Sequence, residues 1–439
     1  MKKIESVLPT VDKIYKEYAE KNHFPGFTYG VVVDGKLIHT GTAGYTDLTK
    51  KTPATTQSLF RIASMSKSFT TMAILQLRDA GKLDLDDRAD KYIPEMKNTK
   101  LLTADAPAIT IRHLLTHAAG FPEDNPWGDR QLADTNEELL KLIKSPIAFS
   151  NTPGVAYEYS NLGITLLGYI IQKVSGKTYQ QFINDNIFQP LGMTHTVFKE
   201  HHQQLIPNRV SGYSTDPTGG FRNEYHNLQV AGDGGLYSSV EDLARWDANF
   251  YANRLGKGSP ALIDLMYSTA ALADGSPQSY AFGLGHDRYR GLPIVKHGGG
   301  LNGARTQMIR FGAQRCTIIC LANLSSFEPE TMIWRVADLY LADHLGAVEP
   351  AKAATATPSR VMLSLDKAAL AAYAGRYHSD ELDVDYQLTV LDGQLTLRYS
   401  EQAPILLQAT AADQFHNDGD LKLVFERTLS GDVYQPADG

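Results

Sequence analysis

The order of hydrophobic patterns along the first 345 residues restricts the fold more than any other feature of the sequence. Alternating apolar residues around an Asp-Gly turn open this region at 28–38. Helical periodicity dominates the middle, and alternation returns near the end before a closing helical pattern at 328–343. This order predicts an α+β domain with one antiparallel sheet built from both ends. The helical patterns lie at 11–20, 65–80, 111–118, 136–144, 162–174, 178–186 and 239–251, and the later strand patterns at 280–297, 304–312 and 316–322.

A segment rich in Ala, Pro and Thr divides the chain after this region. It lacks apolar periodicity, so we predict a domain at 1–345, a linker at 346–362 and a second domain at 363–439. The last 77 residues contain 13 Asp or Glu and 5 Lys or Arg, a charge of −8, whereas the preceding residues sum to +1. Alternating apolar residues from Val384 to Tyr399 predict that this acidic part is a small antiparallel β-barrel.

The composition excludes some classes of partner. The formal net charge of −7 does not fit the basic surface that binds nucleic acid. No run of eighteen apolar residues occurs, so we predict no integral membrane segment. The chain begins Met1-Lys2-Lys3, but the residues that follow are too polar for the apolar core of a secretory leader. We expect a cytoplasmic protein, or a periplasmic or secreted one if a leader has been removed, and nothing in the sequence indicates its oligomeric state.

The first candidate for chemistry lies at the start of a largely apolar helical pattern. Ser64 and Lys67 are three positions apart, so on a helix their side chains share one face. Ser66 is adjacent to Lys67 and points roughly 100° away, which makes Ser64 the better nucleophile. A buried lysine can act as the base that a serine nucleophile needs, and an N–H at a helix start can bind an oxyanion. The alternative is that Ser64 caps the helix and Lys67 is solvated.

The second candidate is a polar segment just before the helical pattern at 162–174. Tyr159 could act there as a general acid or base if nearby cations stabilise its phenolate. Asn161 could hydrogen-bond a substrate amide and the lysine ammonium. The alternative is a capping turn in which Asn161 is the helix N-cap.

The third candidate is a glycine-rich segment at a strand end. His297 is followed by three glycines, which allow a ligand to approach the backbone and can leave N–H groups for an oxyanion. The alternative is a plain turn between two strands. Gly298, Gly300 and Gly303 also match a dinucleotide-binding pattern, but a strand pattern follows instead of a helix, so we predict no nucleotide cofactor.

Two histidines four positions apart, His113 and His117, have the spacing of zinc ligands on a helix. No glutamate follows His113 as in H-E-x-x-H, and no companion ligand is evident. We therefore predict no metal site at this position.

The motifs Ser64-x-x-Lys67, Tyr159-Ser-Asn161 and His297-Gly-Gly299, in this order, resemble the active-site motifs of the serine β-lactamase and penicillin-binding protein superfamily. The branch that looks most similar contains class C β-lactamases, D,D-carboxypeptidases, D-aminopeptidases and related esterases. The resemblance covers residues 8–345 and implies an antiparallel sheet flanked by helices, plus an all-helical region, with the site between them. The acidic domain resembles the lipocalin-like barrels of some D-aminopeptidase-type members.

The resemblance also implies roles for individual residues, with a nucleophile, two residues that move protons, a group that binds substrate and an oxyanion hole. Ser64 would be the nucleophile, Lys67 its partner in proton transfer, and Tyr159 the general base. The substrate would be bound by Asn161, His297 and Gly299. The oxyanion hole would be formed by the backbone N–H groups of Ser64 and Gly300.

These roles imply a serine hydrolase that forms an acyl-enzyme on amides, peptides with D-residues or esters, with neither a metal nor an organic cofactor. Its partner would be a small-molecule or short-peptide substrate. The alternatives are a penicillin-binding protein, a weak β-lactamase, or a non-catalytic binding or sensor protein. His297 stands where class C β-lactamases usually have lysine, and a neutral histidine is a weaker anchor for a substrate carboxylate. We therefore do not expect efficient β-lactam hydrolysis.

Overall fold

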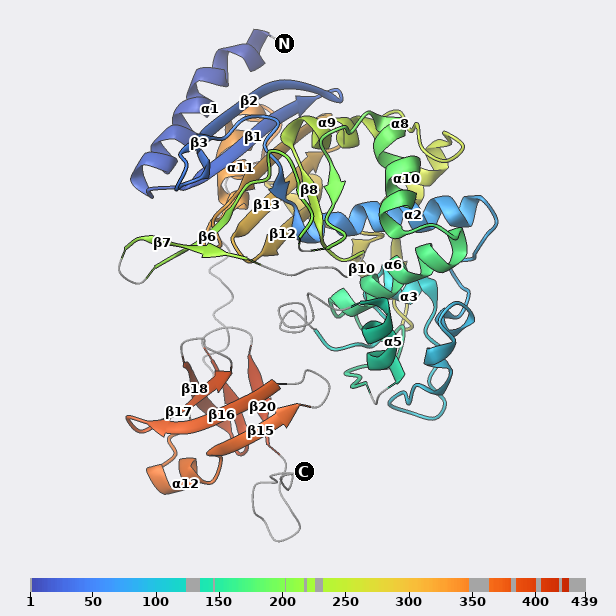
Figure 1. Ribbon diagram of the computed structural model, residues 1–439, viewed down its shortest axis with the longest axis vertical. Coiled ribbons are helices and arrows are strands. Elements are labelled where there is room, and N and C mark those ends of the chain that lie inside the picture. The colour runs from blue at the N-terminus through green and yellow to red at the C-terminus, as the bar shows by residue number, and fades with distance from the viewer. Residues whose placement is uncertain are drawn as a thin grey trace. The chain divides into compact units, whose positions relative to one another are not determined.

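The chain divides into two compact units, Met1–Ala347 and Val348–Gly439 (Figure 1). The computed structural model describes residues 2–123, 135–144, 147–201, 203–216, 219–225, 232–346, 363–379, 384–399, 404–417 and 421–425. Apart from Gly346, the predicted linker lies outside these described residues.

The first unit is built on a nine-stranded antiparallel sheet that joins the two ends of the unit. β1 (Gly26–Val33) pairs along its whole length with β14 (Cys316–Ala322), so that Phe27 lies opposite Ala322. This pairing confirms the sheet expected from strand patterns at both ends. The order across the sheet is β3 (Thr52–Pro53), β2 (Lys36–Asp47), β1, β14, β13 (Ala304–Phe311), β12 (Leu292–Leu301), β11 (Gly285–Tyr289), β10 (Pro277–Ala281) and β9 (Thr269–Ala271).

Helices cover both faces of this sheet, which is why β1 is buried along nearly its whole length. α1 (Lys2–Lys21) and α11 (Pro329–Tyr340) share one apolar core with β1, β13 and β14. On the other face α9 (Val240–Asn249) lies so close that a Cβ at Gly30 would be 2.4 Å from Val240 Cγ1. The glycine therefore permits the approach of helix to strand.

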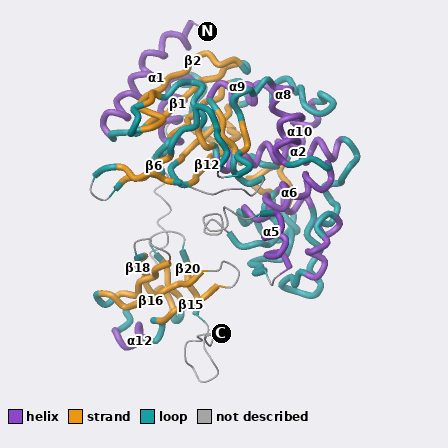
Figure 2. Tube along the Cα trace, in the orientation of Figure 1, coloured by secondary structure: helices purple, strands orange, loops and turns teal. Residues whose placement is uncertain are grey.

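Most of the remaining helices form a region beside the sheet, in agreement with the expected all-helical part (Figure 2). α2 (Ser66–Asp79) and α6 (Asn161–Ser175) pack against each other at its centre, and both are largely buried. The other helical elements are α3 (Ile111–Leu115), α5 (Asn136–Lys144), α7 (Tyr179–Ile183), the π-helical turn Asn184–Phe188, α8 (Gln189–Leu191), α10 (Pro260–Tyr267) and the 3-10 turns Ala89–Lys91 and Pro94–Asn98.

Two small sheets complete the first unit. One carries the strand that leads into Ser64. Their strands are β4 (Phe60–Arg61), β8 (Leu236–Ser238) and β5 (Val197–Phe198) in the first, and β6 (Gly212–Thr215) and β7 (Phe221–Glu224) in the second.

The second unit is a curled antiparallel sheet of six strands in sequential order, packed around its own apolar core. The strand pair predicted around Asp392-Gly393 is present as β16 and β17. Residues 426–439 of the predicted barrel lie outside the described residues. The elements are α12 (Lys367–Ala371), β15 (Gly375–Ser379), β16 (Val384–Leu391), β17 (Gln394–Tyr399), β18 (Ile405–Ala411), β19 (Gln414–His416) and β20 (Lys422–Val424).

One strand prediction was wrong in detail. The pattern at 280–297 is not a single strand but contains parts of β10, β11 and β12, separated by two turns. Gly283 and Gly291 adopt φ values of +75° and +85° at these turns, a conformation that glycine adopts without strain.

Candidate active site

Ser64 lies in a tight turn between the small sheet and the central helix. The 3-10 turn Ala63–Met65 connects β4 to α2, and Ala63 has a φ of +45°, which is uncommon for a residue with a Cβ. α2 begins at Ser66, and its N-cap is Met65 rather than Ser64. The structural alternative, in which Ser64 caps the helix, is therefore wrong.

Lys67 is fully buried in the first turn of α2 and is not solvated. Its Nζ donates to Ser64 Oγ at 3.1 Å, to Asn161 Oδ1 at 2.7 Å and to the backbone oxygen of Asp233 at 2.9 Å. Three acceptors match the three protons of an ammonium group. A neutral amine in the same place would instead accept the Ser64 proton on its lone pair. The cluster can thus hold the proton on either atom.

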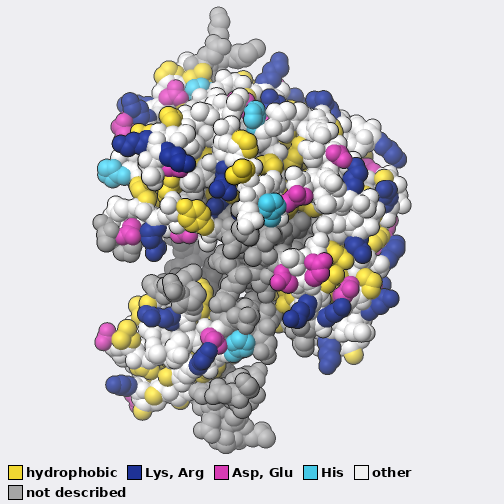
Figure 3. Space-filling view, in the orientation of Figure 1, with side chains coloured by type: hydrophobic (Ala, Val, Ile, Leu, Met, Phe, Trp, Pro, Cys, Tyr) yellow, Lys and Arg dark blue, Asp and Glu magenta, His cyan; other side chains and the backbone are white. Residues whose placement is uncertain are grey.

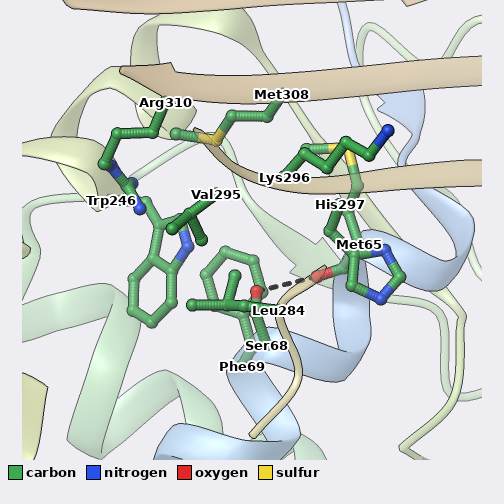
Figure 4. Close-up of a pocket in the computed structure, with 10 residues that line it drawn as sticks. All are labelled: Met65, Ser68, Phe69, Trp246, Leu284, Val295, Lys296, His297, Met308 and Arg310. Carbon is green, nitrogen blue, oxygen red and sulfur yellow. Dashed lines mark hydrogen bonds between the residues drawn. The ribbon is translucent and has the colours of Figure 1, made fainter. Parts of the chain in front are cut away.

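The other serines of this helix start do not share this environment. Ser66 Oγ is buried and has no hydrogen-bond partner among the described residues. Ser68 donates its proton to the backbone oxygen of Met65 at 2.9 Å (Figure 4). Ser68 and His297 are among the residues that line a small cavity (Figure 4). Its volume of about 20 Å³ is large enough for a water molecule. Ser64 is the serine bound to Lys67.

The segment that carries Tyr159 runs into the start of α6. Lys67 Nζ lies 4.9 Å from the centroid of the Tyr159 ring. The N-cap of α6 is Ser160, whose Oγ accepts from Gly163 N at 3.2 Å, and Asn161 is the first helical residue. The alternative with Asn161 as N-cap is thus wrong by one position, and its side chain is available to bind Lys67.

The glycine segment forms an open strand edge instead of a plain turn. β12 and β13 are joined by a two-residue turn, with Leu301 opposite Ala304. A two-residue hairpin closes with a hydrogen-bonded pair, and such pairs alternate along an antiparallel ladder. The N–H of Gly300 therefore points away from β13. β11 pairs with β12 only as far as Lys296, so Gly300 faces the open edge, as an oxyanion hole requires.

Gly299 permits β12 to lie against the nucleophile turn. A Cβ on Gly299 would be 2.1 Å from the backbone oxygen of Ile62 and 2.5 Å from Thr306 Oγ1. Thr306 Oγ1 also donates to Ile62 O at 3.2 Å, which ties β13 to the same turn. The structure gives Gly299 this packing role, and its contact with substrate stays a prediction.

Several residues that hold the site together were not found from the sequence. Arg61 is buried and donates through Nη1 to Asn302 O at 2.5 Å and through Nε to Tyr237 OH at 3.0 Å. It therefore fixes the β12–β13 turn to the strand that precedes Ser64. Asp233 contributes a backbone oxygen, which no residue-type motif reveals. The one signal in the sequence was Arg61 itself, a charged residue within an apolar stretch three positions before Ser64.

His297 is neutral in this environment. Burial, followed by the charge of Lys67, lowers the pKa of His297 to about 4, although a hydrogen bond to Gly298 opposes the shift. Its Nδ1 lies 2.7 Å from Gly298 O and its Nε2 lies 3.0 Å from the hydroxyl of Tyr280. Nδ1 therefore carries the proton and donates, while Nε2 accepts from the tyrosine.

We expect the free energy of unfolding of the first unit to decrease as the pH falls from about 6.5 toward 4. The pKa of His297 is depressed on folding, so the unfolded chain binds more protons in this window and acid favours unfolding. Urea unfolding followed by tryptophan fluorescence measures this, because residues 127, 246 and 334 are the three tryptophans and all precede 347. His297→Asn is expected to reduce this pH dependence without abolishing it, because the pKa values of His113, His117 and His286 are also lowered. A slope equal to the wild type's would contradict the assignment. His23→Asn, at an exposed histidine, is the control.

The surface of the first unit carries both signs of charge. Figure 3 shows Lys and Arg interspersed with Asp and Glu over its visible face, in keeping with a sum near zero. Within the described ranges, no group of three or more His, Cys, Asp or Glu has a metal-binding arrangement. None of the described helices combines the length and apolar character needed to cross a membrane.

The comparisons with known proteins concern the family and the fold of the chain. A family model described as Beta-lactamase matches residues 11–342. A penicillin-binding protein of Bacillus subtilis is 29% identical over 385 residues, which are 83% of this chain and 81% of that protein. The octameric penicillin-binding protein homologue of Pyrococcus abyssi superimposes with a TM-score of 0.67 at 24% identity, over 93% of this chain and 92% of the other. A D-stereospecific amidohydrolase of Streptomyces gives 0.63 at 22% identity, over 76% and 99%.

Proposed function

The chain belongs to the beta-lactamase family, and from this premise we propose that it is a serine hydrolase that forms an acyl-enzyme at Ser64. The substrates that we propose are amides, short peptides with D-residues, or esters. The observation that carries the proposal is the hydrogen bond of 3.1 Å between Ser64 Oγ and the fully buried Lys67 Nζ. A serine without a base in contact is a poor nucleophile, and a buried amine is such a base.

In the acylation step Ser64 Oγ bonds to the substrate carbonyl carbon, and its proton passes to the pair formed by Lys67 and Tyr159. The carbonyl oxygen gains negative charge and is held by the N–H groups of Ser64 and Gly300. As the bond to the leaving amine or alcohol breaks, the pair returns the proton to it. A water molecule then attacks the carbonyl carbon of the acyl-enzyme ester and gives a proton to Tyr159. As the bond between this carbon and Ser64 Oγ breaks, Tyr159 passes that proton to Ser64 Oγ, and the acid is released.

The neutral state of His297 supports an amide or ester substrate over a β-lactam. A neutral imidazole whose two nitrogens are already hydrogen-bonded presents no positive charge to a substrate carboxylate. One of the structural neighbours is a D-stereospecific amidohydrolase, which is in keeping with this preference. We therefore place D-aminoacyl amides and short-chain esters ahead of penicillins and cephalosporins as turnover substrates.

The experiment that tests the proposal is covalent trapping. The full chain is mixed with an activated ester or a fluorescent penicillin, and the reaction is quenched in acid. Mass spectrometry of the intact protein is expected to show one acyl group per chain. Trypsin cleavage after Arg61 and Lys67 releases the hexapeptide 62–67, in which fragmentation distinguishes Ser64 from Ser66. We expect the acyl group on Ser64.

The same experiment separates the alternatives. An adduct that forms and then decays with product release supports the hydrolase. An adduct with penicillin that never turns over, together with no ester turnover, indicates a penicillin-binding protein. Neither adduct nor turnover with D-aminoacyl amides, D-Ala-D-Ala peptides, short-chain esters and a cephalosporin would indicate a binding or sensor protein and reject the proposal.

A further inference from the structure

His117, which the zinc spacing singled out and the proposed chemistry does not use, holds the backbone on both sides of Tyr159. Its carbonyl oxygen accepts from Glu158 N at 2.8 Å, and its Nδ1 accepts from Ser160 N at 3.1 Å. These two donors are the residues directly before and after Tyr159. His117 itself follows α3 with a φ of +55°, a backbone conformation that few residues other than glycine adopt.

The side chain of His117 also supports the Tyr159 ring. The two ring centroids are 4.4 Å apart with planes tilted by 33°. The imidazole centroid also lies 4.7 Å from that of Tyr280, the tyrosine hydrogen-bonded to His297. His117 is 2% exposed, so the ring is a fixed wall of the site.

The imidazole is neutral because of where it lies. Burial, followed by the charge of Lys67, holds the pKa of His117 well below its usual range. Its Nδ1 accepts a hydrogen bond from Ser160 N. Since Nδ1 accepts that bond, the proton is on Nε2, which is buried and has no hydrogen-bond partner among the described residues.

We propose that His117 is a positioning residue for Tyr159, which clamps the backbone at Glu158 and Ser160 and sets the phenol ring beside Lys67. This inference rests on the proposed function, in which Tyr159 is the general base. The side chain of Glu158 is held as well, since Asn151 Nδ2 donates to its carboxylate at 2.7 Å. The residues directly before and after Tyr159 are thus both held by hydrogen bonds to His117.

The first test compares two substitutions that remove different parts of the histidine. His117→Phe keeps a ring but removes the Nδ1 acceptor, and we expect kcat for an activated ester to fall about a hundredfold with KM nearly unchanged. His117→Asn keeps an acceptor near the Nδ1 position and tolerates a positive φ, so we expect it to recover roughly tenfold of that loss. An equal loss in both variants would contradict the clamp.

The second test asks whether the effect passes through Tyr159. We expect His117→Phe to lower the acylation rate about a hundredfold in the wild-type background but less than about threefold in the Tyr159→Phe background. The effects of residues that act as one unit are not additive. The rate of Ser64 acylation is measured with enzyme in excess over substrate, by mass spectrometry of the acyl-enzyme, so that slow variants can still be compared. Multiplying effects would overturn the inference, as would a Tyr159→Phe variant with full activity.

The controls separate this inference from the proposed function and from misfolding. His113→Asn changes a partly buried histidine within α3, whose Nδ1 accepts from Thr110 N at 3.3 Å, and it is expected to keep activity within about threefold. If Ser64→Ala keeps full turnover, the proposed function fails. If Ser64→Ala is inactive while the His117 and Tyr159 effects multiply, only this inference fails. If His117→Phe does not fold, the same cycle with His117→Asn decides.

Discussion

Replacement of Ser64 by alanine is expected to lower kcat/KM by about 10⁴-fold or more, since no covalent intermediate can form without its hydroxyl. The matched control is Ser66→Ala, two residues further along the same turn. Ser66 is fully buried and its Oγ lacks a hydrogen-bond partner among the described residues, so its removal is expected to leave activity within about threefold. Ester hydrolysis is measured for both variants and the wild type, and urea unfolding of the same samples shows whether each variant is folded.

The contrast between the two serines tests the geometry as well as the chemistry. Ser64 lies in the turn just before α2 and Ser66 is the first residue of α2, but Lys67 Nζ donates to Ser64 Oγ alone of these two hydroxyls. A loss confined to Ser64→Ala supports Ser64 as the nucleophile. A comparable loss in Ser66→Ala, or unchanged turnover in Ser64→Ala, would place the nucleophile elsewhere.

Replacement of Asp247 by alanine is expected to lower the free energy of unfolding of the first unit by about 3–5 kcal/mol. Arg310 Nε donates to Asp247 Oδ1 at 2.7 Å, and both side chains are almost fully buried, at 4% and 1% exposure. Burial lowers the pKa of Arg310, but the Asp247 carboxylate more than offsets this, so the guanidinium stays charged. Without Asp247, a buried cation would lose its counter-charge, and Thr317 Oγ1 would lose its acceptor.

A surface pair of the same chemistry is the control. Arg112 and Asp86 form two hydrogen bonds, of 2.7 and 2.9 Å, but the Asp86 side chain is 66% exposed. Asp86→Ala is expected to cost less than about 1 kcal/mol. Urea unfolding followed by tryptophan fluorescence reports on both variants. Equal losses would show that burial of the Arg310–Asp247 pair adds nothing to its contribution.

The sequence predicts the architecture of the first unit well, because its patterns are long and periodic. The buried helix at Ser66–Asp79 and the strands at Ala304–Phe311 and Cys316–Ala322 lie within a residue or two of their expected bounds. The pattern at 280–297 gave one strand where three are involved, since apolar alternation continues across Gly283 and Gly291. The likeness of the second unit to lipocalin-like barrels stays a prediction.

For the site, the sequence indicates which residues belong together but not what holds them. Ser64, Lys67 and Asn161 are joined by the hydrogen bonds of one buried ammonium group. The contributions of Asp233 O and Ile62 O come from the backbone, and backbone atoms leave no trace in residue type. His117 has the spacing of a zinc ligand, but its partners are backbone groups forty residues away, which spacing along one helix does not reveal.

Because β1 pairs with β14, the central sheet can be completed only late in the synthesis of the first unit. Phe27 leaves the ribosome about 295 residues before Ala322, its partner across the sheet. At about 5–20 residues per second, the edge of β1 that pairs with β14 stays unpaired for on the order of 15–60 s, because the hairpin with β2 covers only the opposite edge. Gly300 is made equally late, so a nascent chain has its serine and lysine long before it has the strand edge that completes the site. Activity would thus appear only when the first unit is almost fully translated.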